Sequence, residues 1–429
     1  MKTTIPRLLL ASSALHLGAL AYTVRPHQQQ QQAIIAAPGF DDDASAPSLP
    51  QPPYRDDLLS LHKDLVTIPS ISSQETDAGL FLAKYLVKRG WFVDLQVVPP
   101  LNINGANSNN TERESKRANV LAFPASARHA VPRLLVTSHI DVVPPYISYS
   151  TNSTDGKIDS YTLISGRGSV DAKASVAAQI IAVEELLANN EVSEKDVSFL
   201  FVVGEETHGD GMKFFASNLD DRVKFQSVIY GEPTENKLAC GHKGMGGGTV
   251  HAKGKAGHSG YPWLGKSATE LLVRVLVKLV DADLGSSERF GNTTVNIGTI
   301  EGGVAANVIP KDASAKLAIR VAAGNQSTGS ELVRQKVEQI LKETDEDAFT
   351  LTWAEGYGPV ECECDVDGFE TMVANYGTDV PNFKGDHVSY LYGPGSILVA
   401  HGDDEALQVR DLEAAVEGYK KLIKHALRD

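Results

Sequence analysis

Short apolar runs alternate with segments of helical periodicity from residue 54 onward. Apolar residues spaced three and four positions apart predict helices at 57–66, 77–88, 172–188 and 211–219. Continuous apolar stretches between them predict strands at 92–98, 119–123, 133–137, 197–203 and 227–230. Such strands are buried on both faces, which is typical of a mostly parallel sheet covered by helices. We therefore expect an α/β domain.

The pattern changes near residue 243. The expected elements are then a strand, a helix, two strands, a helix and a strand, at 246–253, 267–281, 292–300, 313–321, 329–342 and 348–353. This is the order of a ferredoxin-like α+β domain. It would be inserted at 243–353 between two parts of the first domain, 54–242 and 354–429. In the second part we expect a helix at 368–376, a strand at 396–400 and a closing helix at 411–427.

The N-terminus has the features of a secretory signal peptide. Lys2 and Arg7 precede the apolar run Leu8–Leu20, and Ala19-Leu20-Ala21 fits a small-residue cleavage site. The run is shorter than the ~20 apolar residues of a spanning helix, which argues against the alternative of a membrane anchor. We expect a signal peptide at 1–21, a secreted protein and no membrane anchor after cleavage. Residues 22–53, with a glutamine run and many prolines, are interpreted as a disordered linker or pro-segment.

Two further features fit an extracellular compartment. Asn-x-Ser/Thr triplets predict glycosylation at Asn109, Asn152, Asn292 and Asn325. Cys362 and Cys364 are spaced too closely to pair easily, so with Cys240 we expect at most one disulfide and a remaining thiol.

The charge of the chain excludes one class of partner. The 429 residues include 40 Lys and Arg against 54 Asp and Glu, a net charge of −14, with no long basic block. Binding to phosphate backbones needs a positive field, so nucleic acid is not expected as a partner.

Acidic and histidine side chains stand where the expected strands end, or after a glycine-rich turn. They are His139, Asp141, Asp171, Glu205, Glu206, Glu232 and His401. Ligands of open α/β sheets bind at the carboxyl ends of the strands. One polar strand end would be unremarkable, but several at one sheet edge predict a functional centre.

The residue types of this set favour a metal site. Imidazole and carboxylate ligands without a thiolate suit zinc, with cobalt or manganese as substitutes. Adjacent residues at a strand end point in opposite directions, so one of Glu205 and Glu206 can bind metal while the other faces a metal-bound water. Asp141 lies two residues beyond His139, where its carboxylate can hold the histidine ring.

Five segments resemble the motifs of the M20 metallopeptidase family. They are Ser138-His139-Ile140-Asp141-Val142-Val143-Pro144, Gly166-Arg167-Gly168-Ser169-Val170-Asp171-Ala172-Lys173, Gly204-Glu205-Glu206, Gly231-Glu232-Pro233-Thr234 and Ala400-His401-Gly402. The resemblance runs in order from about residue 56 to the end. The family includes glutamate carboxypeptidase, aminoacylase, acetylornithine deacetylase and succinyl-diaminopimelate desuccinylase. It implies a zinc-exopeptidase-like catalytic domain at 54–242 and 354–429, and a lid or dimerisation domain at 243–353.

The resemblance also implies a role for each motif residue. One zinc ion would be bound by His139, Asp171 and Glu232. A second would be bound by Asp171, Glu206 and His401, with Asp171 bridging the two ions. Glu205 would be the general base that takes a proton from the bridging water, leaving the metal-bridging hydroxide that attacks, and returns the proton to the leaving amine.

Three residues of the inserted domain match the family as well. His258 would stabilise the oxyanion and in dimeric members reach the neighbouring site, while Asn307 and Arg320 would contact the substrate, Arg320 through a carboxylate. The chain departs from the family pattern at Ala318, where many members have Asp, and at Ala174, where Gly is usual. The alternative for Arg320 is a solvated strand-end charge, and for His258 a loop histidine without a role.

The segment that follows His258 also fits a nucleotide-binding motif. Gly260–Ser267 fits the P-loop pattern GxxxxGK[ST] and precedes an expected helix. Pro262 and the bulky Tyr261, Trp263 and Leu264 suit poorly a loop whose amides must wrap phosphates, so we expect a helix N-terminus without a nucleotide.

Together these observations predict a secreted zinc-dependent carboxypeptidase that hydrolyses an amide bond next to a free carboxylate. The alternative is an N-acyl-amino-acid deacylase, which the segments His242-Lys243-Gly244, Asn375-Tyr376-Gly377 and Gly393-Pro394-Gly395-Ser396 favour. A metal-free binding protein would lack a ligand or Glu205, and all are present. A homodimer could form through an edge strand of the inserted domain, although glycans at Asn292 or Asn325 would oppose it.

Overall fold

The computed structural model describes residues 51–99, 117–220 and 222–428 of the chain. The expected signal peptide, most of the expected linker and Asn109 lie outside these ranges. Within them, no helix is long and apolar enough to cross a membrane.

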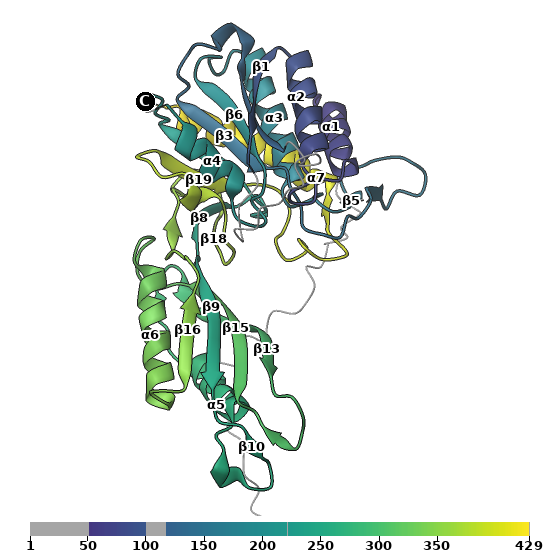
Figure 1. Ribbon diagram of the computed structural model, residues 1–429. Helices are drawn as coiled ribbons and strands as arrows, with labels where there is room; N and C mark the ends of the chain where they lie inside the picture. The colour runs from purple at the N-terminus through teal and green to yellow at the C-terminus, as the bar shows by residue number, and fades with distance from the viewer. Residues whose placement is uncertain (1–50, 100–116, 221, 429) are drawn as a thin grey trace, which may run out of the picture. The chain divides into compact units, whose positions relative to one another are not determined.

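A mixed, mostly parallel sheet forms the centre of the larger part of the molecule (Figure 1). Its order is β1-β2-β6-β3-β7-β19-β8-β17, with β18 paired to β8. The strands are β1 (Trp91–Val97), β2 (Ala118–Pro124), β3 (Leu134–His139), β6 (Val197–Val202), β7 (Ser227–Gly231), β8 (Leu238–His242), β17 (Val360–Glu361), β18 (Thr371–Ala374) and β19 (Val388–Tyr392). The four neighbours β6, β3, β7 and β19 run parallel.

Helices cover both faces of this sheet because its inner strands β3, β6 and β7 are buried at every position. On one face lie α1 (Arg55–Thr67), α2 (Thr76–Lys88), α3 (Lys173–Ala188) and α7 (Val409–Ala426), and on the other α4 (Asp210–Asn218). Alternate residues of β3 enter different cores: Val136 packs with the first group and Leu135 with α4. The expected α/β fold is therefore confirmed. A small sheet of β4 (Ser150–Thr151), β5 (Leu163–Ser165) and β20 (Ala406–Gln408) adjoins it.

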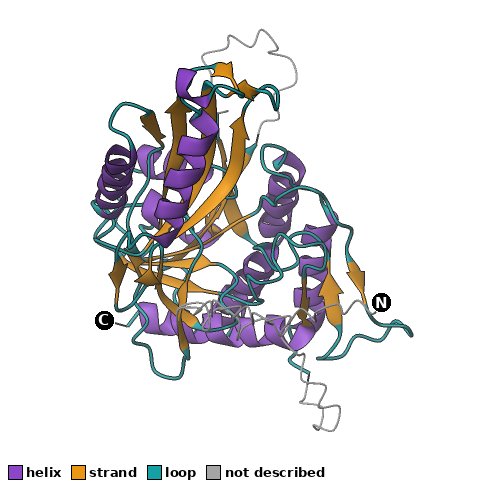
Figure 2. Ribbon diagram, turned by 90° about the horizontal axis from the view of Figure 1, so that it is seen from below, coloured by secondary structure: helices purple, strands orange, loops and turns teal. Residues whose placement is uncertain are grey.

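A second sheet with its own core lies between β8 and β17 in sequence (Figures 1 and 2). Its order is β13-β15-β9-β16, all neighbours antiparallel, with two helices packed on it. The elements are β9 (Gly244–Lys253), α5 (Ala268–Asp281), β13 (Thr294–Gly302), β15 (Asp312–Val321), α6 (Gly329–Thr344) and β16 (Phe349–Trp353). This is the expected ferredoxin-like order, and we call this part the lid. Short pairs β10 (Gly257–His258) with β14 (Val308–Ile309) and β11 (Ser286–Ser287) with β12 (Gly291–Asn292) complete it.

The segment that resembled a P-loop is the start of α5. Ser267 is the N-cap, and its hydroxyl accepts a hydrogen bond from the amide of Glu270 at 3.3 Å. Lys266, which a P-loop would turn toward phosphates, forms an ion pair with Asp345. Ser267 and Glu270 together have the spacing of a capping box, which is sufficient to explain the motif.

Two expected elements in the last part of the chain are wrong. The expected helix at 368–376 contains strand β18, which pairs parallel with β8. The expected strand at 396–400 is a turn on the surface, where Leu398 is 71% exposed. The buried strand of this region is β19, whose β-branched and aromatic residues precede the Gly393-Pro394-Gly395 break. His401 therefore follows a loop and not a strand.

One disulfide joins Cys240 of β8 to Cys364, and Cys362 is a free, buried thiol. This agrees with the expected single disulfide and remaining thiol.

Candidate active site

The central sheet brings four of the expected residues to one edge. His139 is the last residue of β3, Glu232 follows β7, and Glu205 and Glu206 stand in the turn after β6. Because β3, β6 and β7 are parallel neighbours, their carboxyl ends meet. Two loops complete the set, with Asp171 just before α3 and His401 in the turn before β20.

Asp171 lies between the two histidines. Its Oδ1 is 3.0 Å from Nε2 of His139, and its Oδ2 is 3.4 Å from Nε2 of His401. The same nitrogen of His401 lies 2.9 Å from Oε2 of Glu206. The ligand atoms of His139, Asp171 and Glu232 lie within 4.8 Å of one another, as do those of Asp171, Glu206 and His401. The structure thus brings together the two expected ligand groups with Asp171 common to both.

Asp141 acts on its neighbours in a different way from that expected. The Nδ1 of His139 bonds the backbone carbonyl of Asp141 at 2.9 Å, whereas the Asp141 carboxylate is 3.6 Å from that nitrogen. This bond leaves Nε2 of the ring free to face Asp171. The Asp141 carboxylate accepts hydrogen bonds from the amides of Glu205 and Glu206, at 3.1 and 3.2 Å. Asp141 therefore orients the His139 ring and fixes the turn that carries both glutamates.

A glycine and a buried ion pair also stabilise the turn that carries Glu205 and Glu206. Gly204 has a φ of +73°, and a Cβ there would lie 3.0 Å from the guanidinium of Arg117. Arg117 in turn pairs with the buried carboxylate of Asp210 at the start of α4. Only glycine combines this backbone conformation with so close an approach.

The pKa values of the carboxyl groups of the site are shifted in opposite directions. Burial raises the pKa of Glu205 and of Glu232 well above the ordinary value, and it also raises the pKa of Glu206. Burial acts in the same direction on Asp171, but hydrogen bonds from His139 and His401 outweigh it and lower the pKa of that carboxyl. One carboxylate of the set therefore stays ionised because it has two cationic partners.

The pKa values of the two histidines of the site are raised. Burial alone would lower the pKa of His139, but the carboxylates of Asp141 and Asp171, at 3.6 and 3.0 Å from its ring nitrogens, raise it well above the ordinary value. Hydrogen bonds to Asp171 and Glu206 raise the pKa of the half-exposed His401 to about 10. Protons on these groups thus offset the negative charge, and a metal ion would have to displace them.

The donor set fits divalent metal ions. Each group supplies one imidazole nitrogen and carboxylate oxygens, which are the ligands that zinc, cobalt and manganese accept. The carbonyl that bonds His139 is the kind of outer contact that orients metal-binding histidines.

The three expected lid residues do not lie together. Arg320 pairs with Met245 at the end of β15 that adjoins the central sheet, where its charge affects the pKa of Tyr357 and His242. His258 and Asn307 adjoin each other at the opposite end, since His258 pairs with Val308 and the amide of Ser259 bonds the carbonyl of Asn307. The ten residues of β9 separate these ends by about 30 Å.

Reasoning from the sequence missed two buried acids near the metal groups. Asp379 adjoins a small cavity that His139 and Glu232 also line, and burial raises its pKa to about 6. Glu405 is 1% exposed and bonds the loop that ends in Asp171. Neither follows a strand of the expected pattern, and Glu405 stands in an acidic run that resembles a solvated surface segment.

Comparisons with known proteins agree with this geometry. Residues 240–348 match the family model described as a peptidase dimerisation domain, and residues 119–234 match that of peptidase family M28. A peptidase M20 domain-containing protein of Sordaria macrospora is 65% identical over 88% of this chain and 86% of its own length. A protein of Aspergillus oryzae named a probable carboxypeptidase is 48% identical over 86% of this chain and 88% of its own.

Solved structures share the fold at lower identity. A Staphylococcus aureus tripeptidase has a TM-score of 0.68 and 18% identity, covering 87% of this chain and 99% of its own. A metallo-carboxypeptidase of the M20 family from Sulfolobus solfataricus has a TM-score of 0.64 and 18% identity, with 86% and 99% covered. A Bacillus subtilis protein titled a dinuclear metal-binding peptidase of that family has a TM-score of 0.59 and 15% identity, with 87% and 97% covered.

The shared position of Asp171 predicts an unequal effect of ligand substitutions. Asp171→Ala should remove both metal ions, whereas His139→Ala and His401→Ala should each retain about one ion per chain, because each histidine belongs to one group. Metal content after dialysis, measured by plasma mass spectrometry, tests this. Retention of one ion by Asp171→Ala would contradict the sharing of this carboxylate.

The raised pKa of His401 predicts that metal binding strengthens with pH. Because this pKa is about 10 in the metal-free protein, the ring carries a proton at pH 6 to 8 and must release it to bind metal. The association constant should therefore rise about tenfold per pH unit for each proton released. Calorimetry at one pH in two buffers of different ionisation enthalpy counts the protons directly. Metal binding without proton release would refute this charge state.

Proposed function

This chain belongs to the M20 family of peptidases, and from that premise we propose that it is a secreted, zinc-dependent carboxypeptidase hydrolysing the amide bond next to a free carboxylate. The protein is a metal-dependent peptidase, as its relatives named carboxypeptidases and its structural neighbours indicate. The observation that carries the finer proposal is the pair of ligand groups joined by Asp171, with Glu205 beside them and Arg320 at the near end of the lid.

Two groups of residues of the site would bind the two metal ions. His139, Asp171 and Glu232 would hold one zinc ion, and Asp171, Glu206 and His401 the other. Bound there, the ions would polarise the scissile carbonyl and lower the pKa of a water molecule.

Glu205 belongs to neither ligand group, although its pKa responds to Glu232 and His139. We assign to its carboxylate the transfer of a proton from the attacking water to the leaving amine.

Glu205→Gln should keep both metal ions and lose about 10²–10⁴-fold in turnover, because the amide has the same size but cannot accept the proton. Metal content and kcat are to be measured on the same preparation. Glu206→Gln is the matched control, since it should lower metal content together with activity. If Glu205→Gln also loses metal in proportion to activity, its assignment as the general base is wrong.

Arg320 is the residue we propose for binding the substrate carboxylate. It is half-buried, it acts on the pKa of Tyr357, and Tyr357 in turn responds to the charge of Glu205. Its guanidinium can form two parallel hydrogen bonds with a carboxylate. The leaving amine of a carboxypeptidase substrate carries this carboxylate, and so does that of an N-acyl amino acid.

The test of the proposal compares three candidate substrates. These are a peptide with a free C-terminus, the same peptide with a C-terminal amide, and an N-acetyl amino acid. We expect release of the C-terminal residue from the free peptide only, and a higher KM for that peptide in Arg320→Gln than in the unchanged protein. Faster hydrolysis of the N-acetyl amino acid would establish the deacylase alternative, and release of N-terminal residues would refute both.

Secretion and glycosylation remain part of the proposal. The signal-peptide pattern at 1–21 supports secretion. Asn152, Asn292 and Asn325 are all exposed, as acceptor sites of glycans must be.

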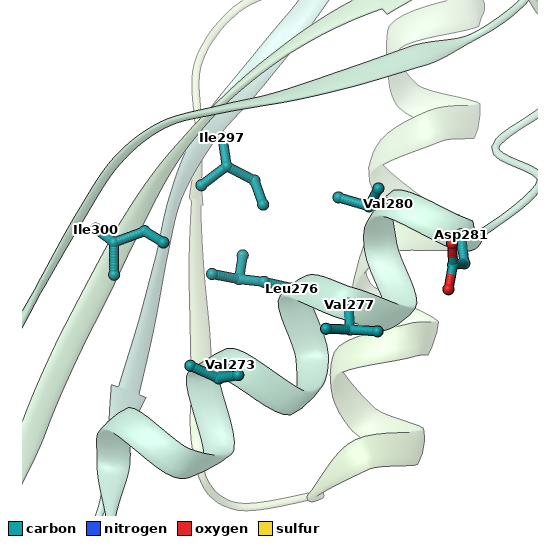
Figure 3. A pocket seen from close by; sticks show the side chains of 7 residues that line it. All are labelled: Val273, Leu276, Val277, Val280, Asp281, Ile297 and Ile300. Atoms are coloured by element: carbon teal, nitrogen blue, oxygen red, sulfur yellow. The ribbon is translucent and has the colours of Figure 1, made fainter. Parts of the chain in front are cut away.

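We further propose a homodimer formed through the lid. Four apolar side chains of α5 and β13 are more than half exposed: Val273, Val277, Val280 and Ile300. Figure 3 shows them around an apolar hollow of about 310 Å³ that Leu276 and Ile297 also line. β13 is an edge strand of the lid sheet, and the exposed face of α5 adjoins it across this hollow. A second copy fits this surface because residues 240–348 match a dimerisation domain. Asn292 lies in β12 beside this edge, so a glycan there would have to point away from it.

The dimer would bring His258 to a metal site. Its position about 30 Å from the near end of the lid leaves it remote from the site of its own chain. From there, His258 and Asn307 would act on substrate bound to the partner, with His258 donating a hydrogen bond to the developing oxyanion.

Mixing inactive Glu205→Gln with inactive His258→Ala should restore about a quarter of wild-type activity. Half of the dimers are then mixed, and one of their two sites has both groups. Exchange is verified by co-purification of differently tagged chains. The control replaces His258→Ala with a chain carrying both substitutions, which should restore nothing. If exchange occurs and activity does not return, His258 does not act across the dimer.

A further inference from the structure

An ion pair buried beneath the metal groups takes no part in the chemistry proposed above. Arg167 Nη1 lies 2.8 Å from Glu405 Oε2, and both side chains are 1% exposed. The two residues are 238 positions apart in the chain. Such a pair is costly to bury unless its remaining donors and acceptors are bonded, so their partners indicate what it does.

Glu405 organises the loop that ends in Asp171. Its Oε1 accepts hydrogen bonds from the amides of Gly168, Val170 and Asp171, at 3.0, 2.9 and 3.1 Å. Its backbone carbonyl accepts two more, from the amide of Gly166 and the hydroxyl of Ser169. The loop from 166 to 171 is thus wrapped around one acidic residue.

Arg167 extends the same network to His401. Its guanidinium donates to the carbonyl of His401 at 3.3 Å and to that of Gly402 at 3.1 Å. Its Nε also donates to the carbonyl of Pro145, in the segment that follows His139 and Asp141. His401 has a φ of +64°, a conformation that a non-glycine residue retains only where its surroundings impose it.

The ligands differ in how they are held. His139 and Glu232 stand at the ends of fully buried parallel strands, so the sheet itself fixes them. Asp171 and His401 stand in loops, and Arg167 and Glu405 join these two loops directly. His401 belongs only to the group with Glu206.

We propose that Arg167 and Glu405 are a positioning pair that holds Asp171 and His401 at metal-binding separation, so that their loss weakens the Asp171–Glu206–His401 group more than the His139–Asp171–Glu232 group. The inference rests on the two metal groups of the proposed function. It concerns metal affinity, so it can fail while the proposed activity stands.

The experiment measures Co²⁺ binding by calorimetry and visible absorption in two backgrounds, each with one group left. In His139→Ala, where the Glu206 group remains, adding Glu405→Gln should weaken Co²⁺ binding by about 10–100-fold, the usual effect of losing a partner of a metal ligand. In His401→Ala, the same substitution should weaken binding by a clearly smaller factor, because the remaining group depends on the Asp171 loop but not on its link to the His401 loop. Equal losses in both backgrounds would overturn the proposal.

Arg167→Lys distinguishes positioning from charge balance. Lysine keeps the positive charge but cannot reach the carbonyls of Pro145, His401 and Gly402 together. We expect the loss seen with Glu405→Gln, whereas full Co²⁺ affinity in Arg167→Lys would mean that neutralising Glu405 is the whole role of the pair.

A control for stability is present in the same chain. Arg55 and Glu413 form another ion pair, at 3.3 Å, between α1 and α7, with side chains 5% and 13% exposed. Glu413→Gln should lower the melting temperature and leave Co²⁺ affinity unchanged. If it lowers Co²⁺ affinity to the same extent as Glu405→Gln, general destabilisation explains both. Should Glu405→Gln not fold, Arg167→Met/Glu405→Gln leaves no unpaired buried charge and provides the same comparison.

Discussion

The carboxylate of Asp171 lies between two histidines, one at each oxygen, and the rest of the site depends on this contact. The carboxylates of Asp171, Glu205, Glu206 and Glu232 lie close together at one sheet edge, where each raises the free energy of ionising the others. Burial raises the pKa of Glu205 and Glu232, while hydrogen bonds from the histidines lower the pKa of Asp171. A cluster of this charge is stable only with bound protons or cations, so the same electrostatics that would destabilise an ordinary core favours metal binding here.

Two kinds of support hold the ligands around Asp171. Strands β3 and β7 are buried at every position and fix His139 and Glu232 through the packing of the whole domain. The loops have no such core, and hydrogen bonds to buried charges replace it. Asp141 holds the turn of Glu205 and Glu206, and Glu405 with Arg167 holds the loops of Asp171 and His401. Each buried charge therefore stabilises a segment that apolar packing leaves unsupported.

The lid has two ends with different chemistry. Arg320 stands at the end next to the central sheet, and His258 with Asn307 stands about 30 Å away. Between them, α5 and β13 present an apolar face (Figure 3). The proposed second copy on that face would give the distant end a role, because it would bring His258 toward the metal site of the partner subunit.

Apolar pattern by itself determined the strands β3, β6 and β7, the ferredoxin-like order of the lid, and the residue types at the strand ends. Long strands and helices leave a pattern in the sequence because positions that face the core are apolar and positions that face water are polar. The same reasoning failed at 368–376 and 396–400, where a strand forms on the edge that β8 offers and an apolar run lies exposed in a turn. Only the tertiary structure decided how His401 meets Asp171 and that Glu405 lies beneath them. Hydrogen bonds between residues 234 to 238 positions apart leave no periodic pattern in the sequence. In the sequence, an acidic residue that accepts hydrogen bonds from buried amides looks the same as an acidic residue on the surface.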